Sequence, residues 1–178
     1  MEIKNVIENY YYEKLNSSHD LSKFSCGVKD LDDFLKEDAL IYQEKNLSVT
    51  YLAMYDGEII GYVSLLADTL PYKKIKNKMT VKLKKYPAIK IGRFAISEKY
   101  KGQHLGQELL INTCNQIKKI ANSIGVYFIT VDAYCNAKGF YSNSAFEYVN
   151  IHNPKKAKRI AERNSKKTIL MFKEINKI

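Results

Sequence analysis

Apolar residues recur along this chain with two different periods, and the change of period marks the expected elements. At residues 28–42 the apolar positions follow three- and four-residue steps with acidic residues on the opposite side, which predicts an amphipathic helix. Residues 48–55 and 58–67 are rich in β-branched and aromatic residues, which predicts two strands. The pair Asp56-Gly57 between them is a strong hairpin signal. The first half of the chain therefore predicts a helix followed by an antiparallel hairpin.

The second half is expected to alternate strands and helices. Apolar residues at four- and three-residue steps predict a helix over 105–124, and Gly125 is well placed to end it. The nearly continuous apolar run 126–134 is typical of a strand that is buried on both faces. Further elements are expected as a strand at 88–97, a short helix at 136–144, and strands at 146–151 and 168–174. This order predicts an α/β protein with a mixed sheet.

The strand expected at 88–97 has an irregularity that bears on function. Its apolar residues change parity at Gly92-Arg93, so one extra residue there would bring them back to a common face. A β-bulge supplies such a residue, and glycine is readily accommodated in one. Because bulges turn backbone groups out of the ladder and are frequent beside active sites, we expect this strand to contribute to a site.

The bulk composition predicts a single domain, residues 1–178, in the cytoplasm. The chain of 178 residues is 46% hydrophobic, which is ample for one core. No apolar run approaches the ~20 residues that cross a bilayer, and the chain starts without a charged-then-apolar signal segment. Three cysteines without CxxC spacing indicate reduced thiols. Three widely separated histidines show no metal-ligand pattern, so we expect no metal.

Charge is distributed very unevenly along the chain. The net charge is +10, but residues 1–70 contain six Lys and thirteen acids, a net of −7. The remainder, 71–178, contains 23 basic residues and six acids, a net of +17. Two segments concentrate the positive charge: a Lys-rich insertion at about 71–87 and a basic stretch at about 153–167. Such asymmetry suggests an anionic partner, although lysine runs are also common on solvated faces.

A strand-to-helix connection within residues 93–110, RFAISEKYKGQHLGQELL, carries the first functional signal. Here the predicted strand ends, a short loop containing Gly102 and Gly106 follows, and the helix begins. The first N–H groups of a helix lack intrahelical partners and lie at the positive end of its dipole, so they suit a phosphate. Glycine lets the backbone approach that phosphate closely. Glycines at such turns are also common for purely structural reasons.

A second segment, residues 131–146 (VDAYCNAKGFYSNSAF), follows the next buried strand, and together the two segments resemble the GNAT family of N-acetyltransferases. The resemblance covers roughly residues 20–150. It implies a GNAT-like acyl-CoA N-acyltransferase fold, in which helices flank a central mixed sheet. FSCGVKDLDDFL (24–35) and the IGRFAIS strand look like the subgroup that includes toxins acting on charged transfer RNA.

The resemblance also implies the residues that bind coenzyme A. The family holds the pyrophosphate on a loop of pattern R/Q-x-x-G-x-G/A, which is matched here by Lys101, Gly102, Gln103, His104, Leu105 and Gly106. Three residues depart from the family: Lys101 replaces Arg or Gln, His104 stands at the first glycine of the pair, and Ala145 replaces the glycine before a final Phe. We expect His104 to be compatible with phosphate binding if its φ is negative and its side chain points outward.

The implied reaction is direct attack of a neutral amine on the thioester of acetyl-CoA. A backbone N–H of the bulged strand would stabilise the oxyanion, and the backbone of Phe94, Ala95 and Ile96 would hold the pantetheine arm. By its position in the family's later motif, at the start of the last helix, Tyr141 is the expected general acid for the leaving thiolate, and a tyrosine is protonated at neutral pH. Asn136 would bind the pantetheine or cap a helix, and Arg93 would bind the acceptor or secure the strand end. No general base is evident.

Several acceptors and functions remain open at this stage. The amine could be the α-amine of an aminoacyl-tRNA, a small molecule, or a protein. The positive charge of the second half is also consistent with a nucleic-acid-binding module. Because His104 replaces a glycine of the family loop, a catalytically inactive GNAT-like interaction module is a further alternative. A toxin role would imply an antitoxin partner, and a homodimer stays open. The absence of an evident base favours an α-amine, which titrates near ~7.7.

Overall fold

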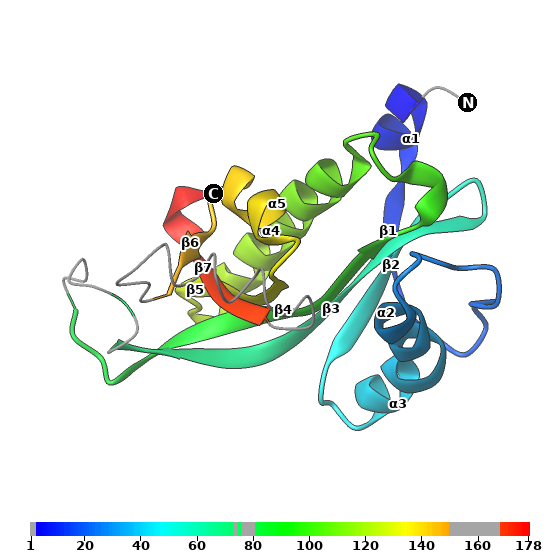
Figure 1. Ribbon diagram of the computed structural model, residues 1–178. Helices are drawn as coiled ribbons and strands as arrows, with labels where there is room; N and C mark the ends of the chain where they lie inside the picture. Colours follow the sequence, from blue (N-terminus) through cyan, green and yellow to red (C-terminus); the bar gives the residue numbers. More distant parts are fainter. Residues whose placement is uncertain (1–2, 73–74, 76–80, 150–167) are drawn as a thin grey trace. The chain divides into compact units, whose positions relative to one another are not determined.

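The computed structural model describes residues 3–72, 75, 81–149 and 168–178. Its strands form a seven-stranded sheet in the order β1-β2-β3-β4-β5-β7-β6 (Figure 1). The strands are β1 (Tyr11–Lys14), β2 (Val49–Tyr55), β3 (Glu58–Pro71), β4 (Lys85–Ile96), β5 (Phe128–Tyr134), β6 (Glu147–Tyr148) and β7 (Thr168–Glu174). The helices are α1 (Ile3–Asn9), α2 (Lys29–Asp33), α3 (Ala39–Glu44), α4 (Leu105–Ile124) and α5 (Lys138–Asn143). The helical turns are η1 (Phe34–Asp38), η3 (Glu98–Tyr100) and η4 (Ile175–Lys177).

The chain divides into two compact units. The first contains Met1–Leu66 and Ile91–Thr113, and the second contains Ala67–Lys90 and Cys114–Ile178. Strands β3 and β4 and helix α4 each contribute residues to both units. The single-domain prediction stays a prediction.

In the first unit the predicted hairpin is confirmed. Strands β2 and β3 pair antiparallel up to Tyr55 opposite Glu58, and both turn residues, Asp56 and Gly57, have positive φ. Positive φ at both central residues is the type I′ geometry that matches the twist of the flanking strands. The register shifts beside Ala53 and Met54, which leaves Ile60 as an extra residue on β3. This bulge was not predicted.

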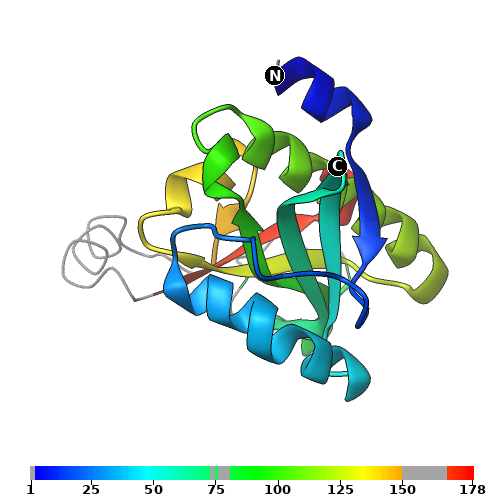
Figure 2. The ribbon, with the colours of Figure 1, turned by 90° about the vertical axis from the view of Figure 1, so that its right-hand side faces the viewer.

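The helix predicted at 28–42 is present but contains an irregular turn. Helix α2, the π-helical turn η1 and helix α3 follow each other directly and form one rod (Figure 2). In the π-turn the N–H of Ala39 donates to the carbonyl of Phe34, five residues earlier. The rod packs on one sheet face, where the Tyr62 hydroxyl donates to the carbonyl of Leu31 at 2.8 Å. The predicted apolar residues Val28 and Tyr42 are, however, 41% and 40% exposed.

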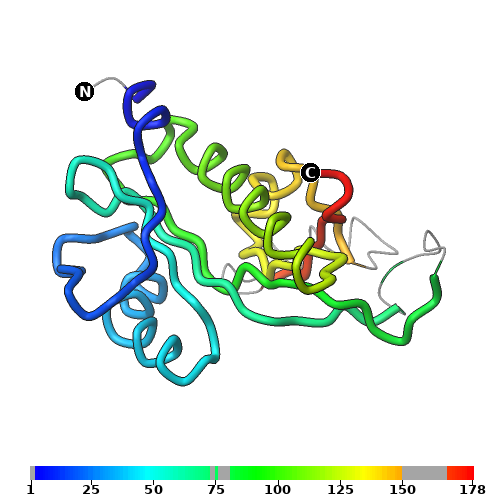
Figure 3. The backbone as a smooth tube through the Cα atoms, turned by 180° about the vertical axis from the view of Figure 1, so that it is seen from behind, coloured from blue at the N-terminus to red at the C-terminus, as the bar shows by residue number. Residues whose placement is uncertain are grey.

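The opposite face of this part of the sheet carries the core of the first unit. Buried residues from α1, β2, β3, η3 and α4 form it: Val6, Ala53, Ile60, Tyr100, Leu105 and Leu109. Helix α1 and strand β1 were not predicted. The chain between β1 and α2 is a long loop that contains two turns, seen in blue in Figure 3.

Helix α4 begins and ends at the residues that the sequence predicts. Leu110, Cys114 and Ile117 are at most 1% exposed, and Gly125 follows with a φ of +68°. The left-handed conformation after the last helical residue is the common glycine C-cap. Ile124, predicted on the apolar face, is instead 68% exposed, since it lies in the last turn where the packed surface ends.

The second unit is built on β5 and β7. These strands pair antiparallel from Phe128 opposite Glu174 to Tyr134 opposite Thr168, and β6 pairs with β7. Residues 128–131 are fully buried, as the apolar run predicts, whereas Asp132 is exposed and pairs with Lys90. The hydrophobic core of this unit consists of aromatic and aliphatic side chains: Leu70, Ile75, Tyr86, Ala88, Phe128 and Phe172.

The two predicted basic segments differ in what the structure describes. Strand β3 ends at Pro71 and strand β4 begins at Lys85, so both strands reach into the insertion predicted at 71–87. They do so because Leu70 and Tyr86 are buried in the core of the second unit. The basic stretch at 153–167 lies outside the described residues. Within the described ranges no helix is long and apolar enough to cross a membrane, and no group of three His, Cys, Asp or Glu is placed to hold a metal. Cys26, Cys114 and Cys135 are buried free thiols.

Candidate active site

The loop 101–106 connects η3 to α4 in the first unit. Residues 101–104 are exposed, whereas Leu105 is fully buried and anchors the first turn of the helix. Gly102 has a φ of +75°, and a Cβ at this position would meet no atom within 4 Å. The helix starts on the His104 carbonyl, which accepts from the N–H of Gln107 at 3.0 Å. The loop thus presents exposed backbone at a helix N-terminus, where an anion is stabilised.

His104 does not have the negative φ that was the condition for reconciling it with phosphate binding. Its φ is +62°, in the left-handed region, and its side chain is exposed. Ala145 likewise has a φ of +63°. Both residues stand where the family places glycine, and the backbone keeps the conformation that glycine adopts most easily. Left-handed backbone at these two non-glycine residues costs about 1–2 kcal/mol each.

Strand β4 carries the second group of predicted residues. Ala95 is 5% exposed, and Phe94 and Ile96 pack partly buried against the core of the first unit. A Cβ at Gly61 would lie 2.8 Å from the Ala95 carbonyl oxygen, so glycine at 61 permits a close backbone approach beside these residues. The bulge predicted at Gly92-Arg93 stays a prediction.

Arg93 is held against the helical rod, and it forms no ion pair with a residue of the described ranges. Its guanidinium lies 5.0 Å from the centroid of the Phe34 ring, and Nη1 donates to the Gly92 carbonyl at 3.0 Å. Its buried Nε has no hydrogen-bond partner among the described residues. A guanidinium has five donors, so further donors remain for a ligand with oxygen acceptors.

Tyr141 lies on α5 in the second unit and is 7% exposed. Burial, followed by the proximity of the Cys114 thiol, raises the pKa of Tyr141 above its usual value. The hydroxyl therefore keeps its proton throughout the physiological range. Its ring packs edge-on against Phe140 and Phe146, with centroids 5.1 and 5.5 Å away.

The end of α5 fixes Tyr141 through its backbone. The Phe146 N–H donates to the Tyr141 carbonyl at 3.1 Å, and the Ala145 N–H donates to the Ser142 carbonyl at 3.1 Å. These two bonds with a left-handed residue between them form a Schellman motif, in which the contact between Tyr141 and Phe146 is the usual hydrophobic partner. Asn136 is exposed and is not the N-cap of α5, since Ala137 occupies that position without a side-chain bond.

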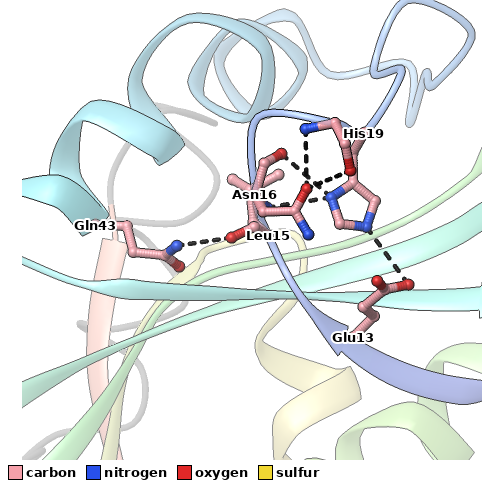
Figure 4. A network of polar contacts seen from close by, with 6 residues as sticks. Glu13, Leu15, Asn16, His19 and Gln43 are labelled. Carbon is pink, nitrogen blue, oxygen red and sulfur yellow. Dashed lines mark hydrogen bonds and ion pairs between the residues drawn. The ribbon is translucent and has the colours of Figure 1, made fainter.

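His19 has a structural role, because both of its ring nitrogens contact polar groups near the turn after β1. The Asn16 N–H donates to Nδ1 at 3.1 Å, and Nε2 lies 3.5 Å from a Glu13 carboxylate oxygen (Figure 4). Nδ1 also lies 3.2 Å from the Asn16 carbonyl oxygen, so both ring nitrogens contact polar groups around this turn. Gln43 donates to the nearby Leu15 carbonyl at 2.7 Å, so the network closes the turn after β1. His152 lies outside the described residues.

The predicted site residues fall into two groups, one in each unit. Residues 93–96 and 101–106 belong to the first unit, and Asn136 and Tyr141 to the second. Sequence reasoning missed the polar contacts between the FSCG turn (24–27) and Glu98, described below. The only sequence signal for them was the FSCG segment itself.

Known proteins match this chain at the levels of family, sequence and structure. The profile of the acetyltransferase (GNAT) family matches residues 11–146. A tRNA-acetylating toxin of Mycobacterium tuberculosis (strain ATCC 25618 / H37Rv) is 27% identical over 136 residues, which are 75% of this chain and 82% of that protein.

Two solved structures share the fold. AtaT complexed with acetyl-methionyl-tRNAfMet has a TM-score of 0.79 at 19% identity, covering 95% of this chain and 96% of that one. A mutant AtaT toxin bound to acetyl-CoA and to the C-terminus of the antitoxin AtaR has a TM-score of 0.71 at 19% identity, covering 94% of each chain. The predicted α/β fold of the GNAT type is thereby confirmed.

Proposed function

From the premise that this chain belongs to the acetyltransferase (GNAT) family and is an acetyl-CoA-dependent N-acetyltransferase, we propose that it acetylates the α-amine of an aminoacyl-tRNA. The observation that carries the acceptor is the similarity to a tRNA-acetylating toxin over three quarters of the chain. On the same similarity, we propose that the protein acts as a toxin in the cytoplasm and has an antitoxin as its protein partner. The proposal includes a homodimer, and a measurement of the oligomeric state tests it.

The proposed coenzyme site is the loop from Lys101 to Gly106. Its backbone amides, the N-terminus of α4 and the Lys101 ammonium would bind the pyrophosphate. Two observations support this assignment: the loop is exposed up to residue 104, and Gly102 and His104 hold the left-handed backbone that glycine adopts most easily. The backbone of Phe94, Ala95 and Ile96 would hold the pantetheine arm.

The proposed general acid is Tyr141. The attacking amine forms the new C–N bond as the C–S bond breaks, the amine loses one proton to water, and the leaving thiolate gains one from the Tyr141 hydroxyl. Solvent returns a proton to the tyrosinate, so that the products are the amide and the thiol. The Schellman motif supports the role because it fixes the ring. The raised pKa keeps the acid form loaded at neutral pH.

The acceptor proposal also rests on charge. Residues 71–178 carry a net charge of +17, and Lys82, Lys84 and Lys85 in their described part are exposed. Arg93, with donors left over beside the proposed pantetheine strand, is proposed to bind an oxygen of the acceptor. Phosphate contacts by such residues give binding that weakens steeply with salt.

Coenzyme A release tests the function directly. The purified protein with acetyl-CoA is expected to release coenzyme A in the presence of aminoacyl-tRNA at low salt, and far less with uncharged tRNA, a polyamine or a peptide. A protein that binds tRNA without releasing coenzyme A would be a binding module. A protein that acetylates a small amine or peptide but no aminoacyl-tRNA would refute the acceptor while leaving the enzyme class intact.

A further inference from the structure

The FSCG turn (24–27) is not part of the proposed reaction, yet it is closely tied to the helix that follows. The Cys26 N–H donates to the Asp32 carboxylate at 2.8 Å, and the Gly27 N–H donates to the Ser25 hydroxyl at 3.2 Å. Phe24 and Cys26 are 3% and 2% exposed. Buried side chains and internal hydrogen bonds therefore make this turn a rigid structure at the start of α2.

The turn contacts one residue distant in sequence, Glu98. The Glu98 N–H donates to the Ser25 carbonyl at 2.9 Å, and the Ser25 hydroxyl lies 3.3 Å from the Glu98 carboxylate. The same hydroxyl lies 3.2 Å from the Asp32 carboxylate. A serine hydroxyl has one proton and donates to one carboxylate at a time, so Ser25 joins Asp32 and Glu98 as a shared donor.

Gly27 makes room for the Glu98 side chain. Its φ is +71°, and a Cβ at this position would lie 2.4 Å from Oε1 and 2.7 Å from Cδ of Glu98. Any larger residue at 27 must therefore displace that carboxylate. By contrast Gly57, with a φ of +73°, has no atom within 4 Å of the same added Cβ.

Glu98 stands directly before the proposed coenzyme loop. It opens η3, and its carbonyl accepts from the Lys101 N–H at 3.2 Å. The preceding Ser97 N–H donates to the Ile60 carbonyl at 2.9 Å. The first residue of the loop is thus held by hydrogen bonds that lead back to β3 on one side and to the FSCG turn on the other.

We propose that Ser25 and Gly27 are positioning residues for acetyl-CoA, which act through Glu98 to hold the Lys101–Gly106 loop in its binding conformation. The inference rests on the proposed coenzyme site. A loop that is ordered before binding loses less conformational entropy when the ligand binds, so releasing it weakens affinity. The turn contributes to coenzyme affinity without touching the coenzyme.

Gly27→Ala tests this inference, and Gly57→Ala is its matched control. Both substitutions place Ala at nearly the same left-handed φ, but only the first displaces Glu98. We expect Gly27→Ala to raise the Kd for acetyl-CoA about tenfold by calorimetric titration, and Gly57→Ala to leave it within about twofold. Equal Kd values for the two variants, both folded by circular dichroism, would overturn the proposal.

A double-mutant cycle identifies Glu98 as the intermediary. Glu98→Ala alone is expected to raise the Kd, and adding Gly27→Ala to it should raise the Kd no further, because the displaced group is already gone. Additive losses would show that Gly27 acts by another route. If Gly27→Ala fails to fold, Ser25→Ala carries the same test, with Ser18→Ala as the exposed serine control.

Gly106→Val separates failure of the inference from failure of the proposed coenzyme site. A side chain at 106 should block close approach of the pyrophosphate and raise the Kd for acetyl-CoA. If Gly106→Val binds acetyl-CoA normally, the coenzyme site is wrong and the inference falls with it. If Gly106→Val weakens binding while Gly27→Ala does not, only the positioning role is refuted.

Discussion

His104→Gly should stabilise the protein, because it removes a side chain from left-handed backbone. His104 has a φ of +62° and an exposed side chain, so little packing is lost. A non-glycine residue in this region costs about 1–2 kcal/mol. Glycine loses more backbone entropy on folding, which offsets about 0.5–1 kcal/mol. The net gain in the free energy of unfolding should be about 0.5–1 kcal/mol.

Scanning calorimetry or urea unfolding measures this gain, which should appear as a rise in Tm of roughly 1–4 °C for a chain of this size. Gln103→Gly is the matched control: Gln103 is exposed in the same loop, lies outside the left-handed region, and donates to the Lys99 carbonyl at 3.0 Å. It should lose stability. A destabilised His104→Gly would refute the reasoning by showing that the imidazole makes a favourable contact.

The same variant also reports on the coenzyme site. His104→Gly restores the bare backbone of the family pattern, so acetyl-CoA affinity should be unchanged or better. A loss of more than about tenfold, or ~1.4 kcal/mol, would instead make His104 a phosphate ligand.

Three further predictions follow from the second unit. Tyr141→Phe should lower kcat by roughly 10²-fold with little change in the Kd for acetyl-CoA, and unaltered turnover would remove Tyr141 from the mechanism. Ala145→Gly should raise the free energy of unfolding by about 0.5–1 kcal/mol, since it relieves a φ of +63° in the Schellman motif; denaturant unfolding that shows a loss would contradict this. Burial raises the pKa of the Cys114 thiol to about 11, so the native state holds this proton more tightly than the unfolded state. Stability from this thiol is complete below the unfolded pKa of about 8.5 and is lost as pH rises towards 11, so Cys114→Ala should show a shallower alkaline decline in urea titrations.

The sequence predicts elements well where local signals are strong. The predicted and observed ends of helix α4 agree, because its apolar stripe and Gly125 indicate the same boundaries. The hairpin is predicted correctly because its turn requires residues such as Asp56 and Gly57 that tolerate positive φ. Strands β3 and β4 were predicted too short, since the burial of Leu70 and Tyr86 depends on distant partners in the second unit.

The candidate site is predictable only in part for the same reason. The loop 101–106 is found from its glycines and its place before a helix. The left-handed φ of His104 opposes the residue's own preference, so no local rule predicts it. The role of Glu98 is invisible in the sequence, because the Ser25 hydroxyl and the space above Gly27 that receive it lie about seventy residues earlier in the chain.

The π-helical turn in the rod has a consequence for how relatives of this protein differ in length. A π-turn is an α-helix with one residue inserted, and the helical turns on either side keep their faces. Deleting one residue within Phe34–Asp38 should therefore restore regular α-helical hydrogen bonding while Leu31 and Ala39 stay turned to the core. Single-residue gaps between homologous sequences are then expected inside this helix, a place where insertions and deletions are normally rare, rather than in the flanking loops.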